Sequence, residues 1–242
     1  MICHEASSAP AVDAAPAFTR LRIGPWSVAL AFDRLQDVQA SPSRAAVRLA
    51  ESLVAGVLGE AVDAVRVASL PPSGRPVAVV SGEPHPVSVT ISHVPGVVGA
   101  AACETAWVGI DIVDPAEAGR GLDVWFTPDE LALVPDDDGS LRARLWAAKE
   151  AAYKACRFDA GFSPRTVTID TLTGTGFSWT ARHRFGDVLG PGRFTTLGRH
   201  VVAVAATPVG RTGDGGGTVG GGAEAAVGRI PRVPHDSLET RS

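Results

Sequence analysis

Asp111 stands out in this sequence because its neighbours are apolar. It lies inside the run VGIDIV at residues 108–113, which has the composition of a buried strand. An ionised carboxylate in such a place is costly unless a cation or hydrogen-bond donors compensate its charge. Gly109 would let another backbone or a ligand approach this strand closely. On this segment alone, an Asp that caps a turn at a strand end is a slightly better explanation than a ligand site.

Glu150 and Lys154 form a second feature that could do chemistry. They lie four residues apart in WAAKEAAYKA at residues 146–155, so on a helix they share one face, with about 5–6 Å between their Cβ atoms. An exposed ion pair of this kind would contribute only about 0.3–0.5 kcal/mol, and such pairs are common. However, the alanines around Glu150 leave room for a bulky ligand, and Trp146 makes the same face partly apolar.

His93 follows Ile91 and Ser92 at the end of a β run, just before Pro95–Gly96. A histidine at such a junction can donate to a phosphate, although one satisfied locally in the turn is the commoner case for any single histidine. The three cysteines include no C-x-x-C pair, so we expect free thiols rather than a disulfide framework or a zinc site.

The elements that must position these side chains can be read from periodicity and capping. Residues 41–59 predict a helix that Ser41 or Ser43 can cap, and Thr127 with Glu130 forms a capping box at the start of a short helix. A longer helix is predicted over residues 141–156. Strands are predicted over residues 77–80, 87–91, 97–102, 107–113, 166–170, 177–184 and 200–206.

The two halves of the chain are alike in this reading, because each runs helix first and then a small set of strands. The segment Val97–Ala102 also echoes Val201–Ala206. We therefore expect two similar α+β units with a cleft between them. Residues 1–20 predict a flexible leader, and the Gly-rich residues 209–242 a disordered tail that cannot bury enough apolar surface to order itself.

The formal net charge of −4 gives the chain no overall attraction to nucleic acid or anionic membranes. The N-terminus lacks the basic stretch and apolar run of a secretion signal, and no apolar run approaches the roughly 18 residues of a membrane span. We expect a soluble, cytoplasmic protein with no nucleic-acid or membrane partner.

The order of the motifs is more specific than any one of them. Along the chain these are GRP at 74–76, ISH at 91–93, GID at 109–111, FTPDE at 126–130 and WAAKEAAYK at 146–154. This set resembles the 4'-phosphopantetheinyl transferase superfamily, specifically its larger Sfp type with two fused pseudo-repeats. The resemblance implies an α+β fold of two subdomains, each a helix on a small, mainly antiparallel sheet, with the active site between them. The implied subdomains are residues 21–106 and 107–208.

The resemblance also implies roles for individual residues. Asp111 and Glu150 would bind Mg²⁺, with Mn²⁺ as an alternative. Glu150 would activate the acceptor serine, directly or through water, and Lys154 would lie near the diphosphate of coenzyme A. The remaining contacts to coenzyme A are expected from Arg44, Arg48, Arg75, Ser92, His93, Lys149 and Lys154. For Lys149, a contact to a neighbouring loop is an alternative.

Two positions depart from the family pattern. Many Sfp-type members carry a third acidic ligand two residues after the motif Asp, where this chain has Val113. Strand alternation would point Asp114 to the face opposite Asp111, so we expect a site of two carboxylates completed by water. The segment after Lys154, residues 155–161, lacks the early Gly that is common in the family, which leaves the preferred carrier open.

The implied reaction transfers phosphopantetheine from coenzyme A to a serine of an apo acyl or peptidyl carrier protein and releases 3',5'-ADP. Because a two-unit chain would form its own cleft, we expect a monomer. The Sfp pattern favours carriers of polyketide or nonribosomal peptide synthesis in secondary metabolism. The alternatives are a non-catalytic module of the same fold that binds coenzyme A or a carrier, and an unrelated α+β enzyme with only a surface salt bridge at Glu150 and Lys154.

Overall fold

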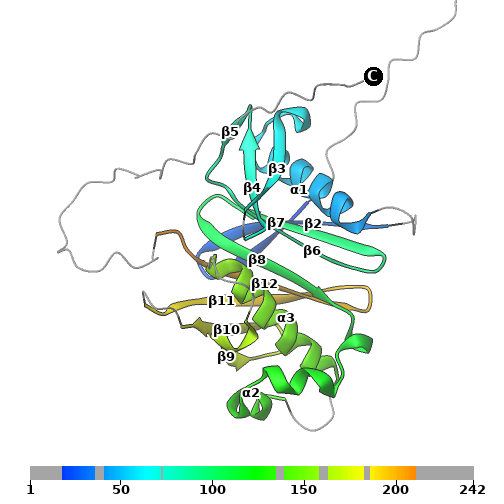
Figure 1. The fold of residues 1–242 in the computed structure, drawn as a ribbon, viewed down its shortest axis with the longest axis vertical. Coiled ribbons are helices and arrows are strands. Elements are labelled where there is room, and N and C mark those ends of the chain that lie inside the picture. Colours follow the sequence, from blue (N-terminus) through cyan, green and yellow to red (C-terminus); the bar gives the residue numbers. More distant parts are fainter. Residues whose placement is uncertain are drawn as a thin grey trace, which may run out of the picture.

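The computed structural model describes residues 18–35, 41–71, 73–134, 139–157, 163–182 and 186–210. They form two α+β units that lie one above the other in Figure 1. The first unit consists of β1 (Thr19–Ile23), β2 (Trp26–Arg34), α1 (Pro42–Leu58), η1 (Val62–Ala64), β3 (Val65–Leu70), β4 (Arg75–Val80), β5 (Glu83–Pro84), β6 (Ser88–Val94) and β7 (Val97–Cys103).

The second unit begins with the strand that follows β7 in the chain. It consists of β8 (Ala106–Val113), η2 (Pro115–Glu117), η3 (Arg120–Trp125), α2 (Pro128–Ala132), α3 (Gly139–Cys156), η4 (Pro164–Thr166), β9 (Val167–Leu172), β10 (Gly176–Ala181), β11 (Val188–Leu197) and β12 (His200–Pro208). Every strand pairing within the two units is antiparallel. The predicted α+β class with mainly antiparallel sheets is therefore confirmed.

The two units share a core topology, although β3, β4 and β5 of the first unit form a separate small sheet. The first sheet has the order β1-β2-β7-β6 and the second β8-β12-β11-β10-β9. In each unit a long strand, β2 or β8, leads to the main helix, and the last strand, β7 or β12, pairs back onto it. The echo between Val97–Ala102 and Val201–Ala206 thus marks two strands in equivalent positions. The expectation that each half begins with its helix was wrong, because β2 and β8 precede the helices.

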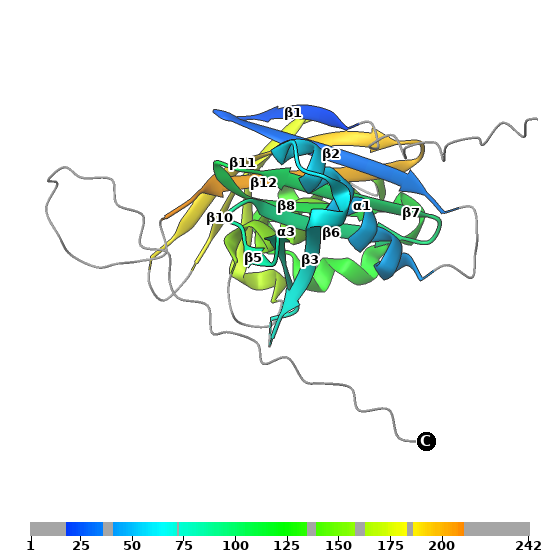
Figure 2. The same cartoon turned by 90° about the horizontal axis from the view of Figure 1, so that it is seen from above.

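Three apolar cores hold these layers together. One lies between α1 and the first sheet, and a second between α3 and the second sheet. The third joins the inner faces of the two sheets and contains Val28, Leu30, Ala101, Val108, Ile110, Ile112, Val202 and Val204. In Figure 2 the hairpin of β1 and β2 lies along one side of the strands of the second sheet, with α3 on the other. The two units are therefore packed through a continuous apolar interface.

The local predictions of the helices hold well. Helix α1 begins after Ser41 and ends at Gly59, which has a left-handed backbone with φ of 72°, although Ser41 makes no side-chain cap hydrogen bond. At α2 the capping box of Thr127 and Glu130 is complete. Pairing of this kind satisfies backbone N–H groups that the first helical turn leaves without partners.

The strand predictions were less complete, because β1, β2, β3, β5 and β11 were not predicted. Strand β1 starts at Thr19, two residues inside the predicted leader. Residues 1–17 of that leader, most of the predicted tail and the end of the predicted strand at 177–184 lie outside the described residues. Cys103 and Cys156, the cysteines of the described residues, are free thiols and are buried. Among the helices of the described part, none has both the length and the apolarity needed to cross a membrane.

Candidate active site

The close packing of α3 on β8 builds the site. A Cβ atom on Gly109 would overlap the carbonyl oxygen of Ala151 and would lie 2.7 Å from the backbone nitrogen of Ala155. The side of α3 that meets the sheet is made largely of small, fully buried side chains. These are Ala143, Ala147, Ala148, Ala151, Ala152 and Ala155. The helix therefore approaches β8 at backbone distance, which brings its polar side chains within reach of Asp111.

Asp111 is buried, with 5% of its surface exposed, and its charge is compensated. Its Oδ1 atom accepts a hydrogen bond from Ser92 Oγ at 3.0 Å and another from Lys154 Nζ at 2.8 Å. The Lys154 ammonium also donates to the carbonyl oxygen of Ile110 at 3.0 Å. These donors supply the compensation that a carboxylate in an apolar strand requires. Asp111 therefore accepts hydrogen bonds from Ser92 and Lys154 and does not cap a turn.

Glu150 lies on the same face of α3 as Lys154, as the spacing predicts. Its Oε2 atom is 4.0 Å from Lys154 Nζ, and 27% of its side chain is exposed. Burial and the nearby Asp111 carboxylate raise the pKa of Glu150 to about 7, while the Lys154 ammonium acts in the opposite direction. Two carboxyl groups thus lie close together, and the pKa of Glu150 is raised above its ordinary value.

A pocket of about 260 Å³ opens beside this pair and draws its walls from both units. The first unit contributes His93 and Val94 from β6. The second unit contributes Asp111, Ile112, Val113, Asp114, Glu117, Ala118, Leu122, Trp146 and Glu150. The pocket therefore combines acidic and apolar side chains, and residues of both units line it.

Asp114 borders the pocket, but its carboxylate is engaged elsewhere. Its Oδ2 atom lies 2.6 Å from Arg199 Nη2, and its Oδ1 atom accepts from the backbone N–H of Ala116 at 3.1 Å. The bond from Ala116, followed by Arg199 and His200, lowers the pKa of Asp114 despite its burial. Asp114 therefore stabilises the start of η2 and the β11–β12 turn, and Val113 fills the position next to the acidic pair with an apolar side chain.

His93 connects the pocket to the start of α1. Its Nε2 atom lies 3.4 Å from Ser43 Oγ, and the ring is exposed. The first turn of α1 carries no acidic residue, so its N-terminal end presents a positive partial charge beside His93. Arg44 and Arg48 are exposed on this helix, and Arg75 is half-buried at the start of β4. Among the described residues, these three arginines lie outside the lining of the pocket.

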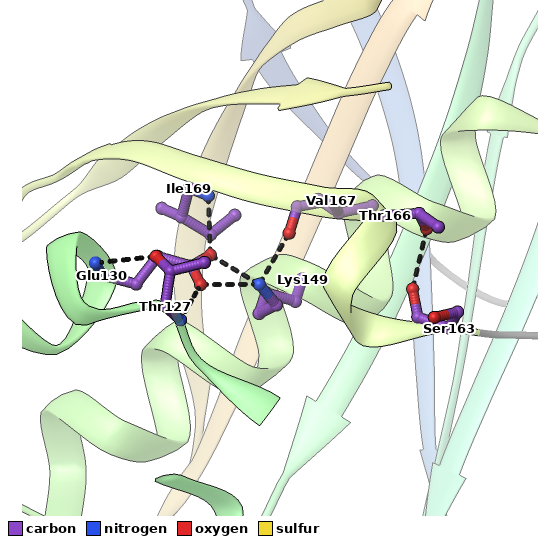
Figure 3. Close-up of polar contacts among 7 residues, drawn as sticks. All are labelled: Thr127, Glu130, Lys149, Ser163, Thr166, Val167 and Ile169. Atoms are coloured by element: carbon purple, nitrogen blue, oxygen red, sulfur yellow. Dashed lines mark hydrogen bonds and ion pairs between the residues drawn. The ribbon is translucent and has the colours of Figure 1, made fainter. Parts of the chain in front are cut away.

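Lys149 is the clear departure from the expected coenzyme A contacts. Its side chain is fully buried, and Nζ donates to Glu130 Oε1 at 2.6 Å, Glu130 Oε2 at 2.8 Å and the carbonyl oxygen of Val167 at 2.6 Å (Figure 3). Glu130 accepts in addition from the backbone N–H groups of Thr127 and Ile169. Lys149 therefore fixes α2 and β9 to α3. This agrees with the alternative that Lys149 contacts a neighbouring segment of the protein. The expectation that it contacts coenzyme A was wrong.

Several residues of the site had not been singled out as site residues in the sequence. Ser43 contacts His93, and Glu117 and Leu122 from the 3₁₀ segments line the pocket together with Trp146. The Asp114–Pro115 pair was a usable signal for the turn that brings these segments over the site. Their contacts bridge distant parts of the chain, so no local periodicity could have shown them.

The acidic pair offers carboxylate oxygens to a metal ion. Within the described ranges, no group of three or more His, Cys, Asp or Glu side chains is arranged to hold one. Asp111 and Glu150 nevertheless suit Mg²⁺, which proteins commonly bind through one or two carboxylates together with substrate phosphates and water. A cation between them would also relieve the repulsion that raises the pKa of Glu150.

Fold and site together define a two-unit α+β protein with a dicarboxylate pocket between its units. Residues 107–205 match the family model of the 4'-phosphopantetheinyl transferase superfamily. The matched region runs from β8 into β12 and contains Asp111, Glu150 and Lys154. This part of the chain is therefore similar to that superfamily of transferases. A search among curated proteins gave no match.

Proposed function

We propose that this protein transfers the 4'-phosphopantetheine moiety of coenzyme A to a serine of an apo acyl or peptidyl carrier protein, as a Mg²⁺-dependent holo-carrier-protein synthase. The observation that carries the proposal is the meeting of Asp111, Glu150 and Lys154 beside a pocket shared by both units. The superfamily match covers these three residues. We further propose that residues 21–106 and 107–208 are fused repeats of the Sfp type, on the ground of their common topology.

Asp111 and Glu150 would hold the metal ion in this proposal. Ser92 and Lys154 both donate to Oδ1 of Asp111 and so hold its carboxylate in place beside Glu150. When bound, Mg²⁺ would neutralise the diphosphate of coenzyme A and stabilise the charge that develops during phosphoryl transfer. The acidic side chains of the pocket would then accept an anionic substrate.

Side chains of the protein would accept the serine proton and stabilise the leaving group, 3',5'-ADP. The serine oxygen of the carrier forms a bond to the phosphorus that bears the pantetheine arm, and the bond from that phosphorus to the 3',5'-ADP oxygen breaks. Glu150 would accept the serine proton, directly or through water. Lys154, with a side chain 30% exposed, would stabilise the departing 3',5'-ADP.

His93 and the start of α1 are the proposed site for the phosphates of coenzyme A. The ring nitrogen, the Ser43 hydroxyl and the N-terminal end of α1 present donors and positive partial charge to one region. Arg44 and Arg48 on the same helix, and Arg75 at β4, would add charge around the nucleotide. In this proposal the anionic end of the substrate would lie on the first unit and the reacting phosphorus near the second.

The direct test is a mass measurement. Purified protein is incubated with coenzyme A, Mg²⁺ and apo carriers of fatty-acid, polyketide and peptide synthesis, and each carrier is examined for the mass gain of one phosphopantetheine. The same assay with Asp111→Ala is the control for the site. No mass gain with any carrier, from protein whose folded state is verified, would reject the enzyme and favour a non-catalytic module that binds coenzyme A or carriers.

The preferred carrier follows from the same panel. We propose carriers of secondary metabolism, by analogy with Sfp-type enzymes, and a cytoplasmic monomer as the working form. Comparison of kcat/KM across the panel tests the first point, since a preference for the fatty-acid carrier would contradict it. Sedimentation of the purified protein tests the second.

A further inference from the structure

At the boundary between the two units, two serine side chains of β6 accept hydrogen bonds from the backbone of β8. Backbone carbonyl groups would have this role in a continuous sheet. Strand β6 ends the first sheet and β8 ends the second, so each has a backbone edge without a neighbour in its own sheet. Ser88 Oγ accepts from the backbone N–H of Val108 at 3.0 Å, and Ser92 Oγ accepts from that of Ile112 at 3.1 Å. The two hydroxyls thus satisfy two edge N–H groups of β8 that would otherwise be buried without partners.

The geometry of the pair is regular. Ser88 and Ser92 are four residues apart on β6 and therefore lie on the same face of the strand. Their partners on β8 are also four residues apart, so the serines fix one register between the units. Both side chains are buried. Ser92 consequently lies behind the acidic pair within the protein, which corrects its expected role as a contact to coenzyme A.

The two serines differ in the acceptor to which the hydroxyl group donates. A serine hydroxyl has one proton to donate, and that of Ser92 goes to Oδ1 of Asp111 at 3.0 Å. The residue at the equivalent position before Val108 is Trp107, which offers no carboxylate. Ser88 and Ser92 therefore make the same contact to the β8 backbone, but only Ser92 also holds an acidic side chain of the site.

We propose that Ser92 is a positioning residue that orients Asp111 for the metal ion, across the boundary between the units. This inference rests on the proposed function for the role of Asp111. Lys154 holds the same oxygen, but its side chain is 30% exposed and would be drawn toward the diphosphate when substrate binds. Ser92 is fixed by Ile112 and stays in place, so it keeps Asp111 oriented during the reaction. Groups that orient metal ligands in this way commonly affect metal affinity by about 10- to 100-fold.

The chain provides a matched control for the experiment. Ser92→Ala and Ser88→Ala each remove one hydroxyl from the seam and leave one β8 N–H group without its partner. We therefore expect each variant to lose thermal stability, measured by the shift in Tm, and Ser92→Ala to lose more, because it also removes the hydrogen bond to Asp111. Only Ser92→Ala should weaken binding of Mg²⁺, by about 10-fold or more, when Mg²⁺ is titrated calorimetrically into the full chain saturated with coenzyme A. Ser88→Ala should stay within about twofold of the unchanged protein, and Ser92→Thr should restore most of the affinity.

The outcomes separate this inference from the proposed function. Equal Mg²⁺ affinities of Ser92→Ala and Ser88→Ala, failure of Ser92→Thr to restore the affinity, or no Mg²⁺ binding by the unchanged protein would each overturn the positioning role. If Ser92→Ala does not fold, Ser92→Cys takes its place, and the same comparison with Ser88→Cys decides. The titration contains no carrier, so it is read independently of transfer, whose absence in the unchanged protein would reject the proposed function instead.

Discussion

The backbones of Gly109 on β8 and Ala151 on α3 approach so closely that a methyl group on Gly109 would overlap the Ala151 carbonyl oxygen. This contact sets the distance between the strand that carries Asp111 and the helix that carries Glu150 and Lys154. Any residue larger than Gly at this position must push the helix away from the strand, because the obstructing atoms belong to the backbone and have no rotamer to change.

Gly109→Ala should therefore destabilise the protein by about 1–3 kcal/mol or more, as overpacking does in well-filled cores, and should abolish transfer in the molecules that remain folded. Urea unfolding and the carrier mass assay measure the two effects. Gly174→Ala is the control, because a Cβ at Gly174 would meet no atom within 4 Å. Full activity of Gly109→Ala would show that the distance between β8 and α3 does not limit the reaction.

Glu150→Gln should reduce kcat by about 10²-fold or more, since it removes a charge and the proposed proton acceptor. It should also change the dependence of stability on pH in metal-free buffer. Because the pKa of Glu150 is raised from 4.5 to about 7 in the folded protein, the folded state holds this proton more tightly than the unfolded state. The unchanged protein therefore loses stability as pH rises from about 4.5 to 7, and the Gln variant does not.

The free energy of unfolding of Glu150→Gln, relative to the unchanged protein, should thus be higher at pH 8 than at pH 5 by on the order of 1–3 kcal/mol. Chemical unfolding at the two pH values, with a chelator present, provides the comparison. Glu117→Gln, which removes the charge of an exposed acid in the same pocket, is the matched control. A pH-independent effect of Glu150→Gln would mean that its carboxyl group titrates normally.

Lys149→Met should cost about 3–5 kcal/mol of stability, because it leaves the buried Glu130 carboxylate without its cation. The double variant Lys149→Met/Glu130→Leu should regain only part of this loss, since Glu130 also accepts from the N–H groups of Thr127 and Ile169. Thermal unfolding of the three proteins tests the order. A stable Lys149→Met protein with a raised KM for coenzyme A would instead identify Lys149 as a substrate contact.

Val113→Asp should tighten Mg²⁺ binding. Val113 is two residues from Asp111 on β8, lines the same pocket and projects to the same side of the strand. A carboxylate there would add a third protein oxygen to a cation shared by Asp111 and Glu150. A titration of Mg²⁺ against transfer rate is the measurement, with Val113→Asn as the uncharged control. An unchanged titration would show that water already fills this position adequately.

Local features of the sequence determined much of the site. The four-residue spacing of Glu150 and Lys154 placed both on one helical face, and the Thr127–Glu130 box marked the start of α2, because both depend on interactions within one or two helical turns. Gly109 signalled a close approach, although the sequence did not say whether the partner would be a backbone or a ligand. The apolar surroundings of Asp111 signalled a carboxylate that needs compensation.

Only the tertiary structure decided which partners those groups have. Lys149 and Ser92 stand beside motif residues in the chain, yet Lys149 turns into the core toward Glu130, and Ser92 turns toward Asp111. Both contacts join residues 19 positions apart. A side chain's choice between solvent, substrate and a buried partner depends on the packing of α3 and the seam between β6 and β8. These are long-range contacts, on which the local spacing of residue types carries no information.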